Sequence, residues 1–578
     1  MKKFYFICLI FILCLTITVK SNAQANIGDS LAMVDLYKST HGKQWFSDKN
    51  WLTANPLDTW FGLTVMNGRV VAVTLNFNNL TGSLPSSTGN CTQLRNLALR
   101  TNHLKDTIPA SIGNCRQLTE LDLQYNYLSG KIPSSVGECT KLKHVELGDN
   151  LLTGSIPASI GNCTGLKFID LSGNRLTGNI PSEIGNCKKL KSLDFGANKL
   201  SGTIPASIGN CTELRLINFQ HNSLEGSIPS TFGNCINLEF LALFENQLTG
   251  NIPNTLGRCS NLAKLFLDNN KLSGAIPKEL GNCVKLVYLF LNNNQLTGAL
   301  PEELGNCADL YWLSVGYNQL SGPLPVSIGN CKRLFIMSAY YNSFSGSIPD
   351  SYATLNDCNF YFSQNELNGL PSTSMLATFQ GSFKIDMNHY TFTPLEPVAG
   401  LSTAIYYSPQ KNIAVKQTGN ILSVSAGGAL SNNTYQWYKN GRLIKTVTGD
   451  STVNATGPGS YYATVSNAVV TNLVLQSDTL SVNADASGLS AVNTKKSISV
   501  FPNPAKDHIN ILLPGNEYYS GELKAANIYD ESGRLVKSET VSNRANQITI
   551  NIASLSNGIY YAEVNMNGVI SRQKFVKQ

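Results

Sequence analysis

One pattern recurs every 24 residues through the middle of the chain and constrains the fold more than any other feature. Its form is L-x-x-L-x-L-x-x-N-x-L-T-G-x-I-P-x-x-I-G-N-C-x-x, and it covers residues 67–368. The asparagine stands at positions 78, 102, 126, 150, 174, 198, 222, 246, 270, 294, 318 and 342. A fixed period of this length indicates a solenoid, whose repeats bury their apolar sides by stacking on one another.

The residues of one repeat predict its local structure. The L-x-L segment alternates apolar and other residues, which predicts a short strand that buries its leucines and exposes the residues between them. The asparagine side chain can hydrogen-bond backbone groups where the chain leaves the strand. Glycine and proline fix the path on the opposite side. Stacked repeats then pair their strands in parallel at ~4.8 Å, which gives a curved solenoid with a strand-lined concave face.

These repeats resemble the leucine-rich repeat family, in the L-x-G-x-I-P version common in extracellular parts of plant receptors. The resemblance implies an α/β solenoid with parallel strands on the concave face. Such solenoids need terminal caps, and we expect residues 26–66 and 369–404 to supply them. Caps of plant receptors often carry paired cysteines, which the N-terminal segment lacks. Its stability is therefore expected to come from a short helix and from Trp45, Trp51 and Trp60.

Cysteine is a regular part of the repeat. Eleven cysteines stand 24 residues apart, at positions 91, 115, 139, 163, 187, 211, 235, 259, 283, 307 and 331. The family places an inward apolar residue there, and free cysteine behaves as a small apolar residue. The strand spacing lies within the Cα range of a disulfide, but stacked side chains point the same way and eleven cannot all pair. We expect buried free thiols, with occasional disulfides or a metal site as alternatives, and place Cys358 in the terminal cap.

The first residues and the composition indicate where the protein is located. Lys2, Lys3, an apolar segment and Ala23-Gln24-Ala25 are typical of a secretory signal peptide, here residues 1–25. No later stretch approaches the ~20 apolar residues of a membrane helix. Charged residues make up 14% of the chain, the formal net charge is +7, and there are no Lys/Arg blocks. We therefore expect an exported protein with no transmembrane segment, no nucleic-acid partner and no cofactor.

The last third of the chain has the pattern of two β domains. Residues 405–484 contain YQWYKNGRLI and GPGSYYATV, which resemble an immunoglobulin-like sandwich. The resemblance implies that Trp437 is the core tryptophan and that Tyr461 is the tyrosine-corner residue. Ala463 occupies the place of the usual second cysteine, so the inter-sheet disulfide is absent. A spacer role is the simpler interpretation, and residues 485–495 are expected to be a linker.

Residues 496–578 carry a second set of motifs: Pro502, Asn503 and Pro504, then Asp530 with Gly533, then Gly558, Tyr560, Lys574 and Lys577. Together they resemble the C-terminal sorting domain of type IX secretion substrates in Bacteroidetes. The resemblance implies a second all-β sandwich, contact with the type IX secretion machinery and passage through the outer membrane. Removal of the domain would leave the protein attached to lipopolysaccharide at the cell surface or released.

Two rows of polar residues invite other functions. The residue between the strand leucines is acidic in four consecutive repeats: Asp122, Glu146, Asp170 and Asp194. Carboxylates at this spacing could bind Ca²⁺ or another cation, or act as an acid/base pair. Lys143, Lys167 and Lys191 lie three residues earlier and can offset the row, which favours a solvated charge row. A Ser/Thr ladder before the repeat glycine, from Thr81 to Ser345, could in principle order water at an ice surface.

The variable strand positions of the C-terminal repeats are rich in aromatic residues. They are Phe240, Phe244, Phe266, Tyr288, Phe290, Trp312, Tyr317, Tyr340, Tyr341 and Tyr361. Exposed aromatic clusters are common anchors of interfaces, and their flat rings also suit sugars. The alternatives are that a neighbouring domain covers the rings, or that curvature packs them together. We expect a non-catalytic binding or adhesion protein for a protein or glycan; the alternative is an extracellular enzyme or a Ca²⁺-dependent binder.

Overall fold

The computed structural model describes residues 26–483, 498–501, 505–512, 524–530, 534–541, 547–566 and 569–578. The predicted signal peptide and linker, and Pro502, Asn503, Pro504 and Gly533, lie outside these residues. The chain divides into two compact units, Met1–Ala484 and Asp485–Gln578, which are described separately. The first unit holds the solenoid with the antiparallel sheets that follow it, and the second holds the C-terminal β domain.

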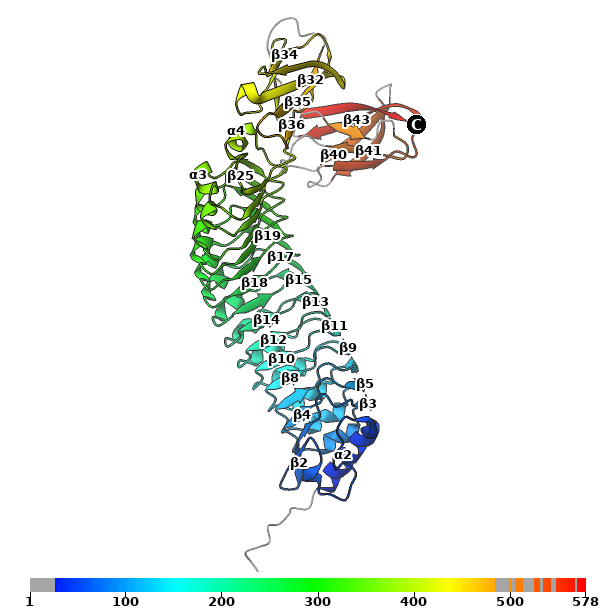
Figure 1. Cartoon of the computed structure of the whole chain (residues 1–578). Helices are drawn as coiled ribbons and strands as arrows, with labels where there is room; N and C mark the ends of the chain where they lie inside the picture. The colour runs from blue at the N-terminus through cyan, green and yellow to red at the C-terminus, as the bar shows by residue number, and fades with distance from the viewer. Residues whose placement is uncertain are drawn as a thin grey trace, which may run out of the picture. The chain divides into compact units, whose positions relative to one another are not determined.

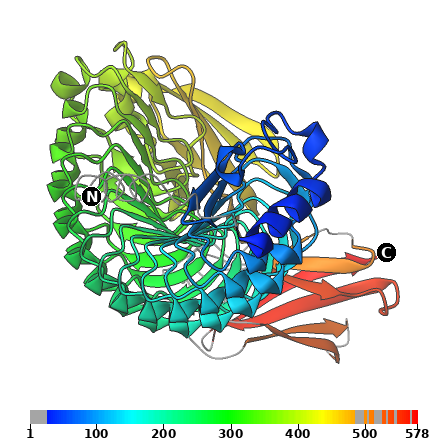
Figure 2. The ribbon, with the colours of Figure 1, turned by 90° about the horizontal axis from the view of Figure 1, so that it is seen from below.

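The repeats form the predicted solenoid (Figures 1 and 2). One strand from each turn joins a 16-stranded concave sheet, which is parallel except for its first pair. Its strands are β1 (Leu63–Met66), β2 (Arg69–Thr74), β4 (Asn96–Ala98), β6 (Glu120–Asp122), β8 (His144–Glu146), β10 (Phe168–Asp170), β12 (Ser192–Asp194), β14 (Leu216–Asn218), β16 (Phe240–Ala242), β18 (Lys264–Phe266), β20 (Tyr288–Phe290), β22 (Trp312–Ser314), β24 (Ile336–Ser338), β26 (Asn359–Tyr361), β28 (Ser382–Lys384) and β29 (Ala404–Tyr406).

The L-T-G segments pair separately from the concave sheet. The first two are β3 (Thr81–Ser83) and β5 (His103–Lys105). The others form an 11-stranded sheet of β7 (Ser129–Lys131), β9 (Leu151–Gly154), β11 (Arg175–Gly178), β13 (Lys199–Thr203), β15 (Ser223–Ser227), β17 (Gln247–Gly250), β19 (Lys271–Ala275), β21 (Gln295–Gly298), β23 (Gln319–Gly322), β25 (Ser343–Ser347) and β27 (Glu366–Gly369). A 3-10 helix follows each repeat proline, from η3 (Ser86–Asn90) to η14 (Asp350–Thr354), and these helices line the outer rim in Figure 2.

The repeat asparagines form a hydrogen-bonded ladder through the solenoid. The amide nitrogen of Asn126 donates to the carbonyls of Leu99, Leu123 and Gln124 at 3.0, 3.1 and 3.2 Å. Its amide oxygen accepts from the backbone N–H of Leu104 in the preceding turn at 3.0 Å. One buried side chain thus satisfies backbone groups of two consecutive turns, as the sequence predicts.

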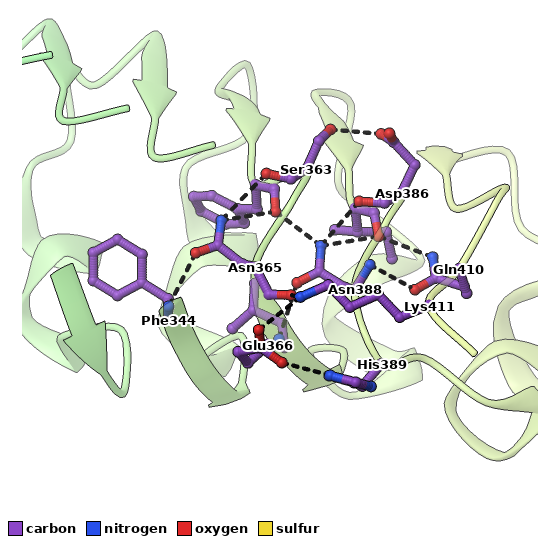
Figure 3. A network of polar contacts seen from close by, with 12 residues as sticks. Phe344, Ser363, Asn365, Glu366, Asp386, Asn388, His389, Gln410 and Lys411 are labelled. Carbon is purple, nitrogen blue, oxygen red and sulfur yellow. Dashed lines mark hydrogen bonds and ion pairs between the residues drawn. The ribbon is translucent and has the colours of Figure 1, made fainter. Parts of the chain in front are cut away.

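The ladder continues beyond the last regular repeat into the C-terminal cap (Figure 3). Asn365 and Asn388 make the same contacts, and the side-chain oxygen of Gln410 accepts from the backbone N–H of Asn388 at 3.1 Å. Lys411 then donates to Glu366 at 2.7 Å, and Glu366 also pairs with His389 at 2.5 Å. The boundary predicted at residues 404 and 405 therefore falls inside β29, a strand of the concave sheet.

The N-terminal cap covers the first turn with the predicted helix and aromatic residues. Helix α2 (Ile27–Ser39) precedes η1 (Gly42–Gln44) and η2 (Leu57–Thr59). Trp45, Trp51 and Trp60 pack with Tyr37 at ring-centroid separations of 4.9 to 5.9 Å along the cluster. The cap also contains an ion pair that was not predicted: fully buried Asp29 accepts hydrogen bonds from Arg69 at 2.9 Å through both carboxylate oxygens.

The C-terminal cap and the sheets after it complete the first unit. The cap contains α3 (Thr373–Leu376), α4 (Phe392–Leu395) and η15 (Glu396–Val398). One antiparallel sheet then holds β30 (Val415–Thr418), β31 (Ile421–Val424) and β34 (Thr452–Asn454). The other holds β33 (Arg442–Thr448), β32 (Asn433–Lys439), β35 (Gly459–Asn467), β36 (Val474–Gln476) and β37 (Leu480–Val482), and η16 (Leu430–Asn432) precedes β32.

The second unit is also antiparallel. Its sheets are β38 (Ser499–Phe501), β39 (His508–Leu512) and β42 (Gln547–Asn551), and β41 (Leu535–Val541), β40 (Lys524–Asp530), β43 (Gly558–Met566) and β44 (Val569–Lys577). Among the motif residues, Tyr560 is buried, and its hydroxyl donates to the Ser556 carbonyl at 2.9 Å. The fold is thus a leucine-rich repeat solenoid followed by small antiparallel β-sheet domains.

The cysteine ladder is confirmed as a row of buried free thiols. All cysteines of the repeats, and Cys358, are free and buried. The Cys163 sulfur donates to the Cys139 carbonyl in the preceding turn at 3.3 Å, and other ladder thiols make equivalent contacts. Burial raises the pKa of the Cys163 thiol to about 12. The cysteines therefore act as small core residues whose S–H groups point toward backbone carbonyls.

This arrangement predicts how the thiols react. The thiolate is the nucleophile, and burial both encloses it and raises its pKa. We expect the native protein without residues 1–25 to react with almost no thiol reagent at pH 8, and the denatured, unreduced protein to titrate all twelve of its cysteines. A colorimetric thiol assay with and without denaturant measures both values. Few free thiols after denaturation would contradict the structure and favour disulfides.

Candidate functional site

The concave face carries the residues that vary between repeats. In the unit L-x1-x2-L-x3-L-x4-x5-N, positions x2 and x3 lie on the concave strand, and x1, x4 and x5 flank it. Parallel pairing sets equal positions side by side, as for Glu146, Asp170 and Asp194 at x3. Each position therefore forms a row across the strands, and the chemistry of a row is set by residues 24 apart in sequence.

The predicted acidic row occupies x3 on β6, β8, β10 and β12, as Asp122, Glu146, Asp170 and Asp194. The prediction that this row is exposed was wrong for Asp122, whose exposed fraction is 7%. Burial raises the pKa of Asp122 to about 6, and burial also raises the pKa of Asp194. The neighbouring turns enclose this position, which the sequence of one repeat does not reveal.

The partners of the acidic row are mostly amides and hydroxyls. Gln124 donates to Asp170 at 2.5 Å, Ser172 donates to Asp170 at 2.6 Å, and Asn218 donates to Asp194 at 3.0 Å. His144 lies 3.5 Å from Glu146. Within the described solenoid, Lys143, Lys167 and Lys191 form no ion pair with the row. Among the described residues, no group of three or more His, Cys, Asp or Glu side chains is placed to hold a metal ion.

The predicted aromatic residues form the second feature of the concave face. We call the following set the aromatic surface: Phe240, Phe244, Phe266, Tyr288, Phe290, Trp312, Tyr317, Tyr340, Tyr341 and Tyr361. Most of its members are half-buried rather than exposed as expected, because the rings contact one another. Ring centroids of Phe266 and Phe290, and of Phe290 and Trp312, are 5.0 Å apart. The alternative that curvature packs rings together therefore holds for part of the set.

A tyrosine group lies beside these rings. Tyr317 and Tyr341 stack with centroids 4.4 Å apart, and Tyr340 meets Tyr317 edge-on at 5.2 Å. Tyr317 and Tyr341 each keep 45% of their surface exposed, so the described residues of the first unit leave them uncovered. Both occupy x5 with a positive φ of 51° and 52°, and x5 has the same backbone conformation in other turns, for example at Ala197 and Asn269. The backbone at x5 is therefore a feature of the repeat, and it accepts residues of very different size.

Several residues of the same face were not predicted from the sequence. Tyr311 and Phe335 at x1 stack on each other with centroids 5.5 Å apart, beside Tyr288. The Lys264 ammonium lies 6.0 Å from the Phe240 ring centroid and 5.6 Å from that of Tyr288. The available signal was the sequence of two consecutive repeats, in which x1 is aromatic although x3 is serine.

The Ser/Thr ladder lies away from the concave face, on the L-T-G strands. Its row is interrupted by Lys105 on β5 and by Glu225 on β15. The charged side chains break the uniform hydroxyl array on which an ice-binding interpretation depends. The concave face is therefore the better candidate for a functional site.

The buried position of Asp122 generates a pH prediction. The folded-state pKa of about 6 lies above the ordinary value of 3.8, so the native state loses stability as pH rises through this interval. Asp122→Asn removes the ionisable group and keeps the oxygen that accepts from the Gln124 backbone N–H. We expect equal stability at pH 4 and a variant more stable by roughly 2 kcal/mol at pH 8.

Urea unfolding between pH 4 and pH 8 measures this difference. The control is Asp35→Asn, which changes an exposed carboxylate on α2. The prediction fails if the difference in unfolding free energy between the Asp122 variant and the wild type does not change with pH. Burial would then not oppose the ionisation of Asp122.

Comparisons with known proteins agree with this architecture. A model described as Leucine Rich Repeat matches residues 117–139, 141–163, 165–187, 189–211, 213–235, 261–283 and 285–307. The plant peptide hormone receptor RGFR1, solved in complex with RGF2, is 32% identical, with 60% of each chain covered and a TM-score of 0.55. The PEPR1–AtPEP1 structure is 30% identical, with 67% of this chain and 59% of that chain covered and a TM-score of 0.58.

The chain thus spans about 60% of the length of these two receptors. A search of curated proteins finds no match. No helix in the described part of the chain has the length and apolar character needed to cross a bilayer. A model described as Secretion system C-terminal sorting domain matches residues 499–578. The chain is a leucine-rich repeat protein with a type IX secretion C-terminal sorting domain, exported to the outer cell surface or the medium.

Proposed function

We propose that this protein is a binding or adhesion protein that holds a protein or glycan ligand on the aromatic surface of its concave face. The observation that carries the proposal is the gathering of aromatic rings at variable positions of consecutive turns. The turn-to-turn contacts use the leucine, asparagine and cysteine positions, so rings at x2 to x5 are not required for stacking. Contiguous aromatic patches of this kind are typical anchors of interfaces.

The solved plant receptors support the proposal by analogy, because RGFR1 is a peptide hormone receptor whose structure was solved in complex with RGF2. The chemistry of the aromatic surface supports it independently. Its rings remain partly in contact with water, and Tyr317 and Tyr341 each keep 45% of their surface exposed. A ligand that covers the rings would remove their exposed apolar surface from water, and this burial favours binding.

We also propose that binding proceeds without catalysis. A hydrolase needs a nucleophile or an acid/base pair converging with charge-stabilising groups on one reacting atom. The acidic row, the candidate for that role, has carboxylates engaged with Gln124, Ser172 and Asn218 inside the solenoid. Ca²⁺ takes six to eight oxygen ligands, and these internal partners compete for the same oxygens. The aromatic surface is therefore the preferred site.

The sheets of residues 415–482 are proposed to be an immunoglobulin-like spacer. Trp437 is fully buried, and the Tyr461 hydroxyl donates to the Gly457 carbonyl at 2.8 Å, as a tyrosine corner does. Glu396 of the solenoid cap accepts from Ala429 at 2.9 Å and from Asn467 at 2.6 Å. These contacts would hold the solenoid out from its point of attachment. Lipopolysaccharide attachment after removal of the sorting domain, or release, is part of this proposal.

The proposal predicts the effect of removing three rings. Phe266→Ala, Phe290→Ala and Trp312→Ala together delete contacts between surface rings but leave the leucine core intact. Interface anchors each contribute more than about 1 kcal/mol, so we expect binding to fall at least 100-fold. The melting temperature should fall by only a few degrees. Arrays of glycans and extracellular proteins, probed with the full chain and the variant, measure the loss.

A matched triple variant controls for the removal of aromatic residues as such. Phe46→Ala, Phe61→Ala and Tyr127→Ala delete exposed rings outside the aromatic surface and should leave every array signal unchanged. If the first triple variant keeps the wild-type array signals, the ligand site lies elsewhere. If it unfolds, the rings belong to the core, and the proposal fails.

A further inference from the structure

Two lysines near opposite ends of the aromatic surface share one environment. Lys264 on β18 pairs in register with Phe240 on β16 and Tyr288 on β20. Lys384 on β28 pairs in register with Tyr361 on β26 and Tyr406 on β29. The Lys384 ammonium lies 4.9 Å from the Tyr361 ring centroid and 5.9 Å from that of Tyr406. Each lysine is therefore held between two aromatic rings on the same concave sheet.

Neither ammonium is neutralised by a carboxylate. Both lysines are exposed, and within the described part of the chain neither takes part in an ion pair. Glu239, whose backbone carbonyl accepts from the Lys264 N–H at 3.1 Å, has its carboxylate paired with Arg215 at 3.0 Å. Rings on both sides restrict each lysine stem and shield part of its charge from water. The two lysines are thus positioned cations available to an anionic ligand.

The distance between successive turns of the solenoid indicates which type of linear ligand fits the concave face. Each turn from β16 to β26 contributes at least one ring to the concave face, on the strand itself except at β24, whose turn contributes Tyr340 and Tyr341 after the strand. Successive turns are ~4.8 Å apart, so Lys264, the first residue of β18, and Lys384, the last residue of β28, are separated by five steps, roughly 24 Å. A pyranose ring advances a linear glycan by about one such step, so successive sugars meet successive turns. An extended peptide places side chains of one face roughly 6.6 Å apart, which does not match the rows.

We propose that the aromatic surface binds a linear acidic polysaccharide of uronic acid residues, which lies across the strands with carboxylates at Lys264 and Lys384. This inference rests on the proposed function and adds its ligand class. The apolar faces of the sugar rings stack on Phe, Tyr and Trp rings, and each ammonium forms a charge-assisted hydrogen bond with a carboxylate. The acidic row on β6 to β12 repels a polyanion, so the bound segment begins near β16 and continues toward β29.

The test uses the full chain and two defined probes, oligogalacturonates and oligomers of alginate. Titration calorimetry measures binding of oligomers of three and eight residues, and of the same oligomers with their carboxyl groups reduced to alcohols. We expect the eight-residue uronate to bind at least tenfold more tightly than the three-residue one, which cannot reach both lysines. Reduction of the carboxyl groups should weaken binding about 100-fold, and added salt should weaken binding of the uronate.

Lysine variants assign the contacts. Lys264→Met and Lys384→Met keep the apolar stem and remove the charge, and each should weaken uronate binding about tenfold. The double variant should bind uronate no better than the wild type binds the carboxyl-reduced oligomer. The matched control is Lys271→Met, which removes an exposed charge of the same repeat as Lys264 on the other sheet. It should bind uronate as the wild type does.

Several results would overturn the inference. They are no binding of either uronate, undiminished binding by the lysine double variant, and equal binding of poly-L-glutamate, which carries carboxylates without sugar rings. These results leave the proposed function standing if the array ligand still depends on Phe266, Phe290 and Trp312. Array binding that survives the aromatic triple variant overturns the proposed function itself, so the two failures are distinguishable.

Discussion

The asparagine ladder is the interaction on which the rest of the solenoid depends. Each ladder amide satisfies carbonyls in its own turn and in the preceding turn, as Asn126 does for Leu123 and Leu99. A buried amide that loses such partners costs about 1–3 kcal/mol for each unsatisfied group, so the chain cannot add or drop a residue between ladder positions freely. Where the period changes near the C-terminus, Asn365 and Asn388 keep the ladder, and Gln410 ends it (Figure 3).

Because the asparagine ladder determines how the turns stack, the residues at x1 to x5 can vary without changing the fold. The cysteines can occupy the core because the ladder already determines how turns stack. The concave rows then differ along the solenoid: carboxylates bound to amides occupy x3 on β6 to β12, and aromatic rings dominate from β16 onward. One part of the uniform backbone thus carries carboxylates that the solenoid itself hydrogen-bonds. The other part carries half-buried rings and exposed lysines, and this is where we propose that the ligand binds.

The sequence predicted whatever depends on spacing alone. The period located the strands, the asparagine contacts and the buried thiols, since each is repeated at the same step. The exposure of Asp122 was not predictable, because side chains from adjacent turns enclose it and curvature sets how closely they approach. Lys384 was missed because its partners Tyr361 and Tyr406 lie 23 and 22 residues away, off the regular period. Asp29 and Arg69 pair across 40 residues of non-repeating cap sequence.

We propose that the asparagine ladder holds the rings and lysines of the concave face at the spacing of a linear acidic glycan. The decisive measurement is a crystal structure of the full chain with an eight-residue oligogalacturonate. We expect sugar rings on the concave face between β16 and β29, one per strand step, with carboxylates at Lys264 and Lys384. A glycan bound on the L-T-G strands, or one that crosses the concave face along the strands, would contradict it.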